Sequence, residues 1–522
     1  MAKQFTLNTK GPIVDTKAGK LRGYGLDDLF MFKGIKYADA KRFRQPTPVE
    51  SWEGVKDALW FTHVAPLLTD NSPNIDHMIP HRFWPESEDC LSLNVWTTSL
   101  DKNAKKAVMV WLHGGGYSAG SSIEMIAYEG DNMAKHGDVV VVTVNHRLNI
   151  LGYFDLSSFG DVYKNSGNAG QADIVEALRW VRDNIANFGG DPGNVTIFGQ
   201  SGGGGKVLSL VQTPEANGLF HKGILMSGGT RKPTGAPRID REIAEALMKE
   251  LGVNDVPGLE ATEWDDLKRA VRKVGAAFAE RGGAMGPGGG FNWSPVANDW
   301  YLGSPWDIGY TEHGKTIPLM VGSVIAEFSF AAHIPNKNEI PSSKRVDMIG
   351  ENFGKEHAAG LIAAWKECYP DKNELGLLSL SNRMGILEFI RQRSEAHSSP
   401  VYGYLFSYDF PIDDGWPAWH CADIPYAFKN AGRVDCCNEP GVMEDLEAAY
   451  FGAYIAFAKT GSPNGPGLKE WPAFTAASRS TMFFDRVSGA AVDRDQKLME
   501  LHEKVAPDPM AAMRRRRQNI TF

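Results

Sequence analysis

Ser201 lies in the stretch Phe198-Gly199-Gln200-Ser201-Gly202-Gly203, directly after the β-branched residues Val195-Thr196-Ile197. This is a G-x-S-x-G pattern with a predicted strand before the serine and a helix-forming stretch, Lys206 to Val211, after it. A serine hydroxyl is a weak nucleophile unless the backbone presents it to a base, and a sharp strand-to-helix turn does this. The glycines beside the serine allow that turn. The pattern indicates a nucleophile, although in a chain with 56 glycines an ordinary turn is the alternative.

A second glycine-rich turn comes earlier in the chain. The strand-like residues Val110-Trp111-Leu112 are followed by His113-Gly114-Gly115-Gly116. Glycines let successive backbone N–H groups point together at a developing negative charge, and each such donor is worth about 3 kcal/mol in a transition state. A nucleophile elbow and an oxyanion turn, each after a predicted buried strand, together indicate acyl transfer. Taken alone, the glycine triplet would be read as an ordinary turn.

Alternating strand and helix patterns are expected to position these two turns. Ala172 to Phe188 has apolar residues at helical spacing, and Gly189-Gly190-Asp191-Pro192 ends it. This alternation predicts a mostly parallel sheet with crossover helices. The predicted strands are Val108–Leu112, Val139–Val144, Val195–Phe198, Gly223–Met226, Ile317–Val321, Val401–Phe406 and Thr481–Phe484. Further helices are predicted over Ile239–Leu251, Thr262–Ala279 and Glu444–Lys459.

Composition excludes several kinds of partner. The net charge of -8 and the pI of about 5.9 argue against nucleic acid or an anionic membrane as a partner. The strongest apolar runs, Ala107–Leu112 and Val139–Val144, fall far short of the ~20 residues that span a bilayer. We therefore expect no membrane span. The basic cluster Arg514–Arg517 is interpreted as a solvated tail.

The five cysteines are too few and too irregularly spaced for a disulfide scaffold or a zinc site. The N-terminus has no apolar signal segment, so a reducing, cytoplasmic compartment is favoured, while a mature secreted form stays open. Nothing in the sequence distinguishes a monomer from a homo-oligomer.

From roughly Gly11 to Phe484 the chain resembles the type-B carboxylesterases of the α/β-hydrolase fold, which include the cholinesterases. The strings that carry the resemblance are Phe32-Lys33-Gly34-Ile35-Lys36-Tyr37-Ala38, Ser87-Glu88-Asp89-Cys90-Leu91-Ser92-Leu93-Asn94-Val95, Asn145-His146-Arg147-Leu148, Asn187-Phe188-Gly189-Gly190-Asp191-Pro192 and Phe457-Ala458-Lys459-Thr460-Gly461-Ser462-Pro463-Asn464. The resemblance implies one α/β-hydrolase domain over residues 1–522. It implies a mostly parallel central sheet with helices on both faces. Helical and loop insertions, at about residues 230–400, would shape the pocket around the active-site gorge.

The family's triad, carried over by its motifs, falls on three residues. Ser201 matches the nucleophile, Glu327 the acid after Val321-Gly322, and His420 the base before Asp423-Ile424-Pro425-Tyr426. In this reading His420 takes the serine proton, Glu327 orients the imidazole, and the backbone N–H groups of Gly115, Gly116 and Gly202 hold the oxyanion. The expected substrate is a small-molecule ester, and no metal or organic cofactor is required.

Several positions depart from the family pattern. Gln200 stands where animal enzymes carry Glu, and Pro80 stands where cholinesterases place a cation-stacking Trp, so choline esters are disfavoured. Gly202 replaces the usual Ala, and Gly203 to Gly205 either loosen the start of the helix or allow close packing on a strand. Residues 1–89 contain no cysteine, so Cys90 is expected to be a buried free thiol.

The acyl-pocket wall matches Gly288 to Trp293, just before Pro295. Glycines there, and the triple glycine at 114–116, suggest an open pocket for medium or bulky neutral esters, including those of tertiary alcohols. The candidate pocket residues are Gln200, Gly289, Phe291, Trp293 and Phe328. Two alternatives stay open: the same triad hydrolysing thioesters, carbamates or activated amides, and a non-catalytic adhesion or binding module on this fold.

Overall fold

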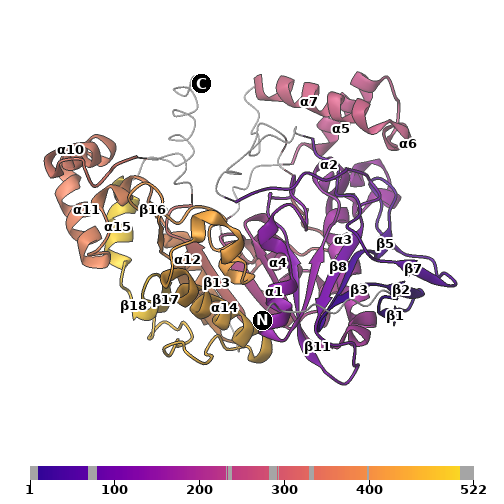
Figure 1. The fold of residues 1–522 in the computed structure, drawn as a ribbon. Coiled ribbons are helices and arrows are strands. Elements are labelled where there is room, and N and C mark those ends of the chain that lie inside the picture. Colours follow the sequence, from indigo (N-terminus) through magenta and orange to yellow (C-terminus); the bar gives the residue numbers. More distant parts are fainter. Residues whose placement is uncertain are drawn as a thin grey trace. The chain divides into compact units, whose positions relative to one another are not determined.

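The computed structural model describes residues 10–68, 79–230, 232, 238–280, 291, 293–327, 334–396 and 399–505. The chain forms two compact units (Figure 1). Unit 1 comprises Met1–Asn74, His81–Ile224 and Lys232–Ile317, and unit 2 comprises Ile75–Pro80, Leu225–Arg231 and Pro318–Phe522. The expected single domain over residues 1–522 stays a prediction. The glycine run 282–290, with Gly289, lies outside the described residues, as do Phe328 and Arg514–Arg517.

Unit 1 is built on strands in the order β11-β9-β10-β8-β4-β3, of which β9, β10 and β11 are parallel. β8 and β4 run antiparallel to their neighbours. All five residues of β10 are buried, as its β-branched sequence predicts for a strand covered on both faces. The bounds are β3 Tyr24–Leu26, β4 Leu29–Lys36, β8 Ser92–Thr97, β9 Lys106–Leu112, β10 Val140–Val144 and β11 Gly190–Gln200. β12, Lys222–Met226, lies where the sequence passes from unit 1 to unit 2.

The helices of unit 1 follow the predicted spacing closely. α3 packs against β11 and ends one turn before Gly189, which adopts the left-handed φ of 75° that favours glycine. A 3-10 turn, Ile185–Phe188, replaces the last part of the predicted helix. α5 and α7 pack on each other through their apolar faces. The bounds are α1 Asp131–Gly137, α2 Asn149–Tyr153, α3 Ala169–Asn184, α4 Gly202–Val211, α5 Asp240–Leu251, α6 Val256–Ala261, α7 Trp264–Glu280, α8 Pro305–Ile308 and α9 Glu312–Lys315.

Unit 2 has strands in the order β18-β17-β14-β13, with β13, β14 and β17 parallel. β14 has the predicted bounds, but β13 begins at Leu319 rather than at Ile317 as predicted. Ile317 instead closes a turn onto Gly314, and Pro318 has no N–H to donate to a strand ladder. The bounds are β13 Leu319–Val324, β14 Val401–Phe406, β17 Ser480–Phe484 and β18 Gly489–Val492.

The helices of unit 2 pack on these strands and on one another. α12 contacts β13 and β14, α14 contacts β17, and α11 packs between α10 and α15 (Figure 1). α14 begins two residues before the predicted start, because the Glu444 side chain accepts a hydrogen bond from the Gly441 N–H at 2.7 Å. The bounds are α10 Ser342–Phe353, α11 Lys355–Cys368, α12 Met384–Glu395, α13 Ile424–Ala427, α14 Val442–Thr460 and α15 Gln496–Val505. Across the described ranges, no helix is both long and apolar enough to cross a bilayer.

Candidate active site

Ser201 occupies the predicted elbow in unit 1. β11 ends at Gln200 and α4 begins at Gly202, so the serine is the single residue that joins them. Its backbone angles, φ of 57° and ψ of -121°, are a conformation that residues other than glycine rarely adopt. A Cβ on Gly203 would overlap the carbonyl oxygen of Leu112 at the end of β9. Close helix-to-strand packing therefore explains this glycine, and the elbow is confirmed.

The glycine turn after β9 folds back sharply beside the elbow. Gly115 and Gly116 have φ values of 77° and 63°. The Gly115 carbonyl accepts hydrogen bonds from the N–H groups of Ser118 and Ala119, at 3.2 and 3.0 Å. A Cβ on Gly115 would overlap Ala119. The turn therefore requires glycine at this position.

Three backbone N–H groups in the turn and the elbow have no hydrogen-bond acceptor among the described residues. Within the part of the chain that the structure describes, the N–H groups of Gly115, Gly116 and Gly202 donate no hydrogen bond. A Cβ on Gly202 would overlap the backbone of Gly116, so these two glycines are in contact. A Cβ on Gly114 would lie 3.6 Å from the Cβ of Ser201. Unpaired N–H groups beside a nucleophile have the chemistry of an oxyanion hole.

Gln200 is buried beneath the same turn. Its side-chain oxygen lies 3.2 Å from where a Cβ on Gly114 would stand. The amide group is neutral, so Gln200 brings no charge to this turn. Its contribution to the substrate pocket stays a prediction.

His420 and Glu327 form a bonded pair in unit 2. Glu327 follows β13, and its Oε2 lies 2.5 Å from Nδ1 of His420. The His420 backbone N–H donates to the Glu327 carbonyl at 3.0 Å, which ties the two segments together a second time. When Nδ1 carries the proton toward the carboxylate, Nε2 is the basic nitrogen of the neutral ring. The structure thus brings the predicted base and acid together.

Two residues to which the sequence assigned no role interact with this pair, one by a hydrogen bond and one by its charge. The Ser381 hydroxyl accepts a hydrogen bond from the Glu327 N–H at 2.8 Å. Asp423 is fully buried, and its carboxylate accepts a hydrogen bond from the Tyr450 hydroxyl at 2.8 Å. The pKa of Asp423 is raised to about 6, mainly by burial; the charge of Glu327 also contributes to the rise, and the Tyr450 hydrogen bond opposes it. Asp423 lies in the motif after His420, but nothing in that motif indicates its burial.

The described candidates for the acyl pocket are packed among apolar side chains. Phe291 and Trp293 are buried, with ring centroids 5.7 Å apart. Trp293 also contacts Phe154, and Phe291 contacts Phe278, both at 5.8 Å. These contacts belong to the hydrophobic cluster that α5 and α7 share. Whether the two rings also face substrate stays a prediction.

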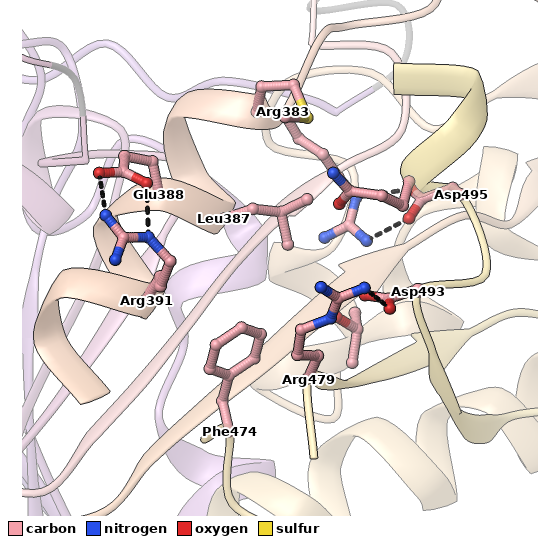
Figure 2. Close-up of a pocket in the computed structure, with 11 residues that line it drawn as sticks. Arg383, Leu387, Glu388, Arg391, Phe474, Arg479, Asp493 and Asp495 are labelled. Carbon is pink, nitrogen blue, oxygen red and sulfur yellow. Dashed lines mark hydrogen bonds and ion pairs between the residues drawn. The ribbon is translucent and has the colours of Figure 1, made fainter. Parts of the chain in front are cut away.

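A small pocket in unit 2 contains none of the predicted site residues (Figure 2). Its arginines are each bonded to carboxylates. Arg383 binds the buried Asp495 at 2.6 Å, Arg391 binds Glu388 at 2.7 Å, and Arg479 binds Asp493. These ion pairs balance their charges, so the pocket offers no uncompensated cation to an anionic ligand.

The described residues contain no group of three or more His, Cys, Asp or Glu side chains arranged to hold a metal ion. Cys90 is buried as predicted, and this burial raises the pKa of its thiol.

A serine on a strand-to-helix elbow is typical of the α/β-hydrolase fold, and a bonded His–Glu pair is typical of its serine hydrolases. The chain belongs to the Carboxylesterase family, whose sequence profile matches residues 10–501. The resemblance to type-B carboxylesterases and the fold class are thereby confirmed. The protein is a serine esterase that hydrolyses carboxylic esters.

Relatives with this fold and activity cover almost the whole chain. It is 30% identical to the para-nitrobenzyl esterase of Bacillus subtilis (strain 168), over 95% of this chain and 98% of the relative. It is 31% identical to a phenmedipham hydrolase of Pseudarthrobacter oxydans, over 93% of this chain and 97% of the relative. A solved structure with a TM-score of 0.90 and 47% identity covers 97% of this chain and 100% of its own. That structure is an esterase from the anaerobic Clostridium hathewayi that can hydrolyse aliphatic aromatic polyesters.

Proposed function

We propose that the protein hydrolyses neutral, medium or bulky carboxylic esters through an acyl-enzyme on Ser201. His420 removes the serine proton as the hydroxyl attacks the ester carbonyl, and Glu327 orients and stabilises the imidazolium. The tetrahedral oxyanion is held by the N–H groups of Gly115, Gly116 and Gly202. The alcohol leaves with the proton from His420, and water then hydrolyses the acyl-enzyme by the same route.

The observation that carries this proposal is the elbow with its unpaired donors. Ser201 is held in a conformation with φ of 57° that the chain would not adopt without strain. Gly116 and Gly202 are packed together beside it, with N–H groups that have no other described acceptor. An ordinary turn, the alternative reading, would have no reason to leave three donors unpaired at one strained serine.

The decisive test is the Ser201→Ala variant, assayed with a p-nitrophenyl ester. Turnover should fall at least about 10⁴-fold with the thermal unfolding midpoint unchanged. An organophosphate should label the wild type once per chain, and peptide mass spectrometry should place the label on Ser201. The exposed Ser343→Ala variant is the matched control and should keep full activity. Retained hydrolysis in Ser201→Ala would overturn the mechanism.

The substrate range is tested separately, with p-nitrophenyl esters of increasing acyl length and with tert-butyl acetate. A protein with the proposed open pocket should hydrolyse both medium acyl esters and the tertiary ester. Activity restricted to the acetate of a small primary alcohol would refute the range while leaving the mechanism intact.

Aromatic diesters are a second candidate substrate class, favoured by the similarity to the Clostridium hathewayi enzyme. A terephthalate diester of a short diol is a soluble probe for this class. Its hydrolysis should be lost in Ser201→Ala together with that of p-nitrophenyl esters. The same triad could hydrolyse thioesters, carbamates and activated amides. These substrates are assayed with the wild type and with Ser201→Ala.

A further inference from the structure

Lys206 is a lysine buried in the interior of unit 1. It lies on α4, five residues after Ser201, and its side chain has no exposed surface. Its Nζ donates a hydrogen bond to the carbonyl oxygen of His113 at 2.9 Å and reaches that of Gly114 at 3.5 Å. These are the two residues directly before Gly115. A buried ammonium is costly unless it is well bonded, so an apolar residue here would serve packing alone at lower cost.

The groups around Lys206 come from several elements. Nδ1 of His113 lies 3.0 Å from the Gly114 carbonyl, and His146 stacks on His113 with ring centroids 5.0 Å apart. The ammonium also lies 5.8 Å from the centre of the Tyr117 ring. Burial lowers the pKa of Lys206 to about 7, and the nearby carboxyl of Glu124 partly opposes this. Charged or neutral, the lysine nitrogen keeps N–H groups to donate.

The Gly114 carbonyl is therefore anchored from two sides. Since a carbonyl only accepts hydrogen bonds, Nδ1 of His113 carries the proton of that contact. A peptide group is planar and trans, so its C=O and N–H point in opposite directions. The Gly114 C=O belongs to the same peptide plane as the Gly115 N–H. Holding this carbonyl toward Lys206 and His113 turns the Gly115 N–H the opposite way.

We propose that Lys206 is a positioning residue for the oxyanion hole. Its hydrogen bonds to the carbonyl oxygens of His113 and Gly114 fix the orientation of the two peptide planes that contain them. It touches neither substrate nor nucleophile and acts through the orientation of the Gly115 N–H. The inference rests on the proposed function, in which that N–H stabilises the tetrahedral intermediate. It adds a residue outside the triad that should control kcat rather than substrate binding.

The test is the Lys206→Met variant, which keeps the length of the side chain and removes its donors. kcat should fall about 10- to 100-fold with KM changed less than about threefold, because the lost interaction acts in the transition state. A trifluoromethyl ketone, which adds to the serine as a tetrahedral oxyanion, should bind more weakly by the same factor. Affinity for the carboxylic acid product should be unchanged.

The matched control is Lys222→Met, which also removes a mostly buried lysine. Lys222 is the first residue of β12, and its ammonium donates a hydrogen bond to the side chain of Asn194 on β11. This variant should lose stability without losing kcat or ketone affinity. Lys206→Arg keeps donors on a long side chain and should recover part of the loss in both quantities.

A Lys206→Met variant that is less stable but has unchanged kcat and ketone affinity would overturn the proposal, leaving a purely structural lysine. Should that variant fail to fold, Lys206→Arg decides: a fall in kcat without an equal fall in ketone affinity overturns the proposal. The ketone must first inhibit the wild type and form no adduct with Ser201→Ala. Failure of that step would refute the proposed function itself, and it is read independently of Lys206.

Discussion

The proposed nucleophile segment in unit 1 and the proposed base–acid pair in unit 2 depend on different kinds of atoms. In unit 1 the proposed chemistry depends on backbone: the elbow at Ser201 and the N–H groups of Gly115, Gly116 and Gly202. In unit 2 it depends on ionisable side chains: the pair His420 and Glu327, linked at 2.5 Å. The unit 1 segment requires residues without a Cβ, whereas the unit 2 pair requires side chains that can carry a charge.

This contrast determines how each side should fail. A backbone site fails when a methyl group is added, because the added carbon displaces peptide planes while every charge is unchanged. A site made of charged side chains fails when a charge is removed, even if the new side chain has the same shape and the fold is unchanged. Single-methyl additions therefore test the backbone segment of unit 1, and isosteric substitutions test the charged pair of unit 2.

Glu327→Gln should have the largest effect. The amide preserves the shape but does not stabilise the imidazolium, and it can favour the wrong tautomer of His420, so kcat should fall about 10⁴-fold. The p-nitrophenyl acetate rate and the thermal unfolding midpoint are the measurements. The exposed Glu356→Gln variant is the control and should match the wild type. If Glu327→Gln kept more than a tenth of the activity, the base side would not depend on charge.

Gly115→Ala should have the next largest effect. The added methyl would overlap the Ala119 carbonyl at a φ of 77° that favours glycine, which displaces the glycine turn, so kcat should fall about 10²- to 10³-fold, the scale of one lost oxyanion donor. Gly360→Ala is the control: it lies on α11 with open space around its Cβ, and should gain up to about 1 kcal/mol of stability at unchanged kcat. An active Gly115→Ala enzyme would show that the turn can move without loss.

The backbone side could be predicted almost completely from the sequence. Glycines at fixed offsets from a serine and from a β-branched strand predict a strand-to-helix elbow. In unit 2 the family motifs indicated Glu327 and His420, and the structure shows these two residues bonded. Predicted strand and helix bounds failed mainly at ends, as at Ile317, where Pro318 delays β13.

What the sequence could not reveal is burial produced by residues far apart along the chain. Lys206 looks like a solvent-facing helix residue until the glycine turn covers it. Ser381 has no motif, although its hydroxyl anchors Glu327 from 54 residues away. Asp423 lies in a family motif, yet its buried carboxylate bonds to Tyr450 on a helix later in the chain. These contacts are properties of the packed core, which local patterns do not encode.

Asp423→Asn should have the smallest effect on rate and a distinct effect on stability. The ordinary pKa of an aspartate is 3.8, and burial raises that of Asp423 to about 6. Between these values the unfolded chain releases its proton while the folded protein retains it, so the wild type should lose about 2 to 3 kcal/mol as pH rises from 4 to 6. Asparagine does not titrate, and its oxygen can still accept the Tyr450 hydroxyl hydrogen bond.

The measurement is urea unfolding at pH 4, 5, 6 and 7 for both proteins. The stability difference between Asp423→Asn and the wild type should grow in favour of the variant up to pH 6 and then level off. The exposed Asp435→Asn variant, which lacks this burial, should run parallel to the wild type. A constant difference across the range would mean that Asp423 is ionised like a surface carboxylate. In that case the base side would depend on the charge of Asp423 as well as on that of Glu327, and kcat of Asp423→Asn should fall more than tenfold.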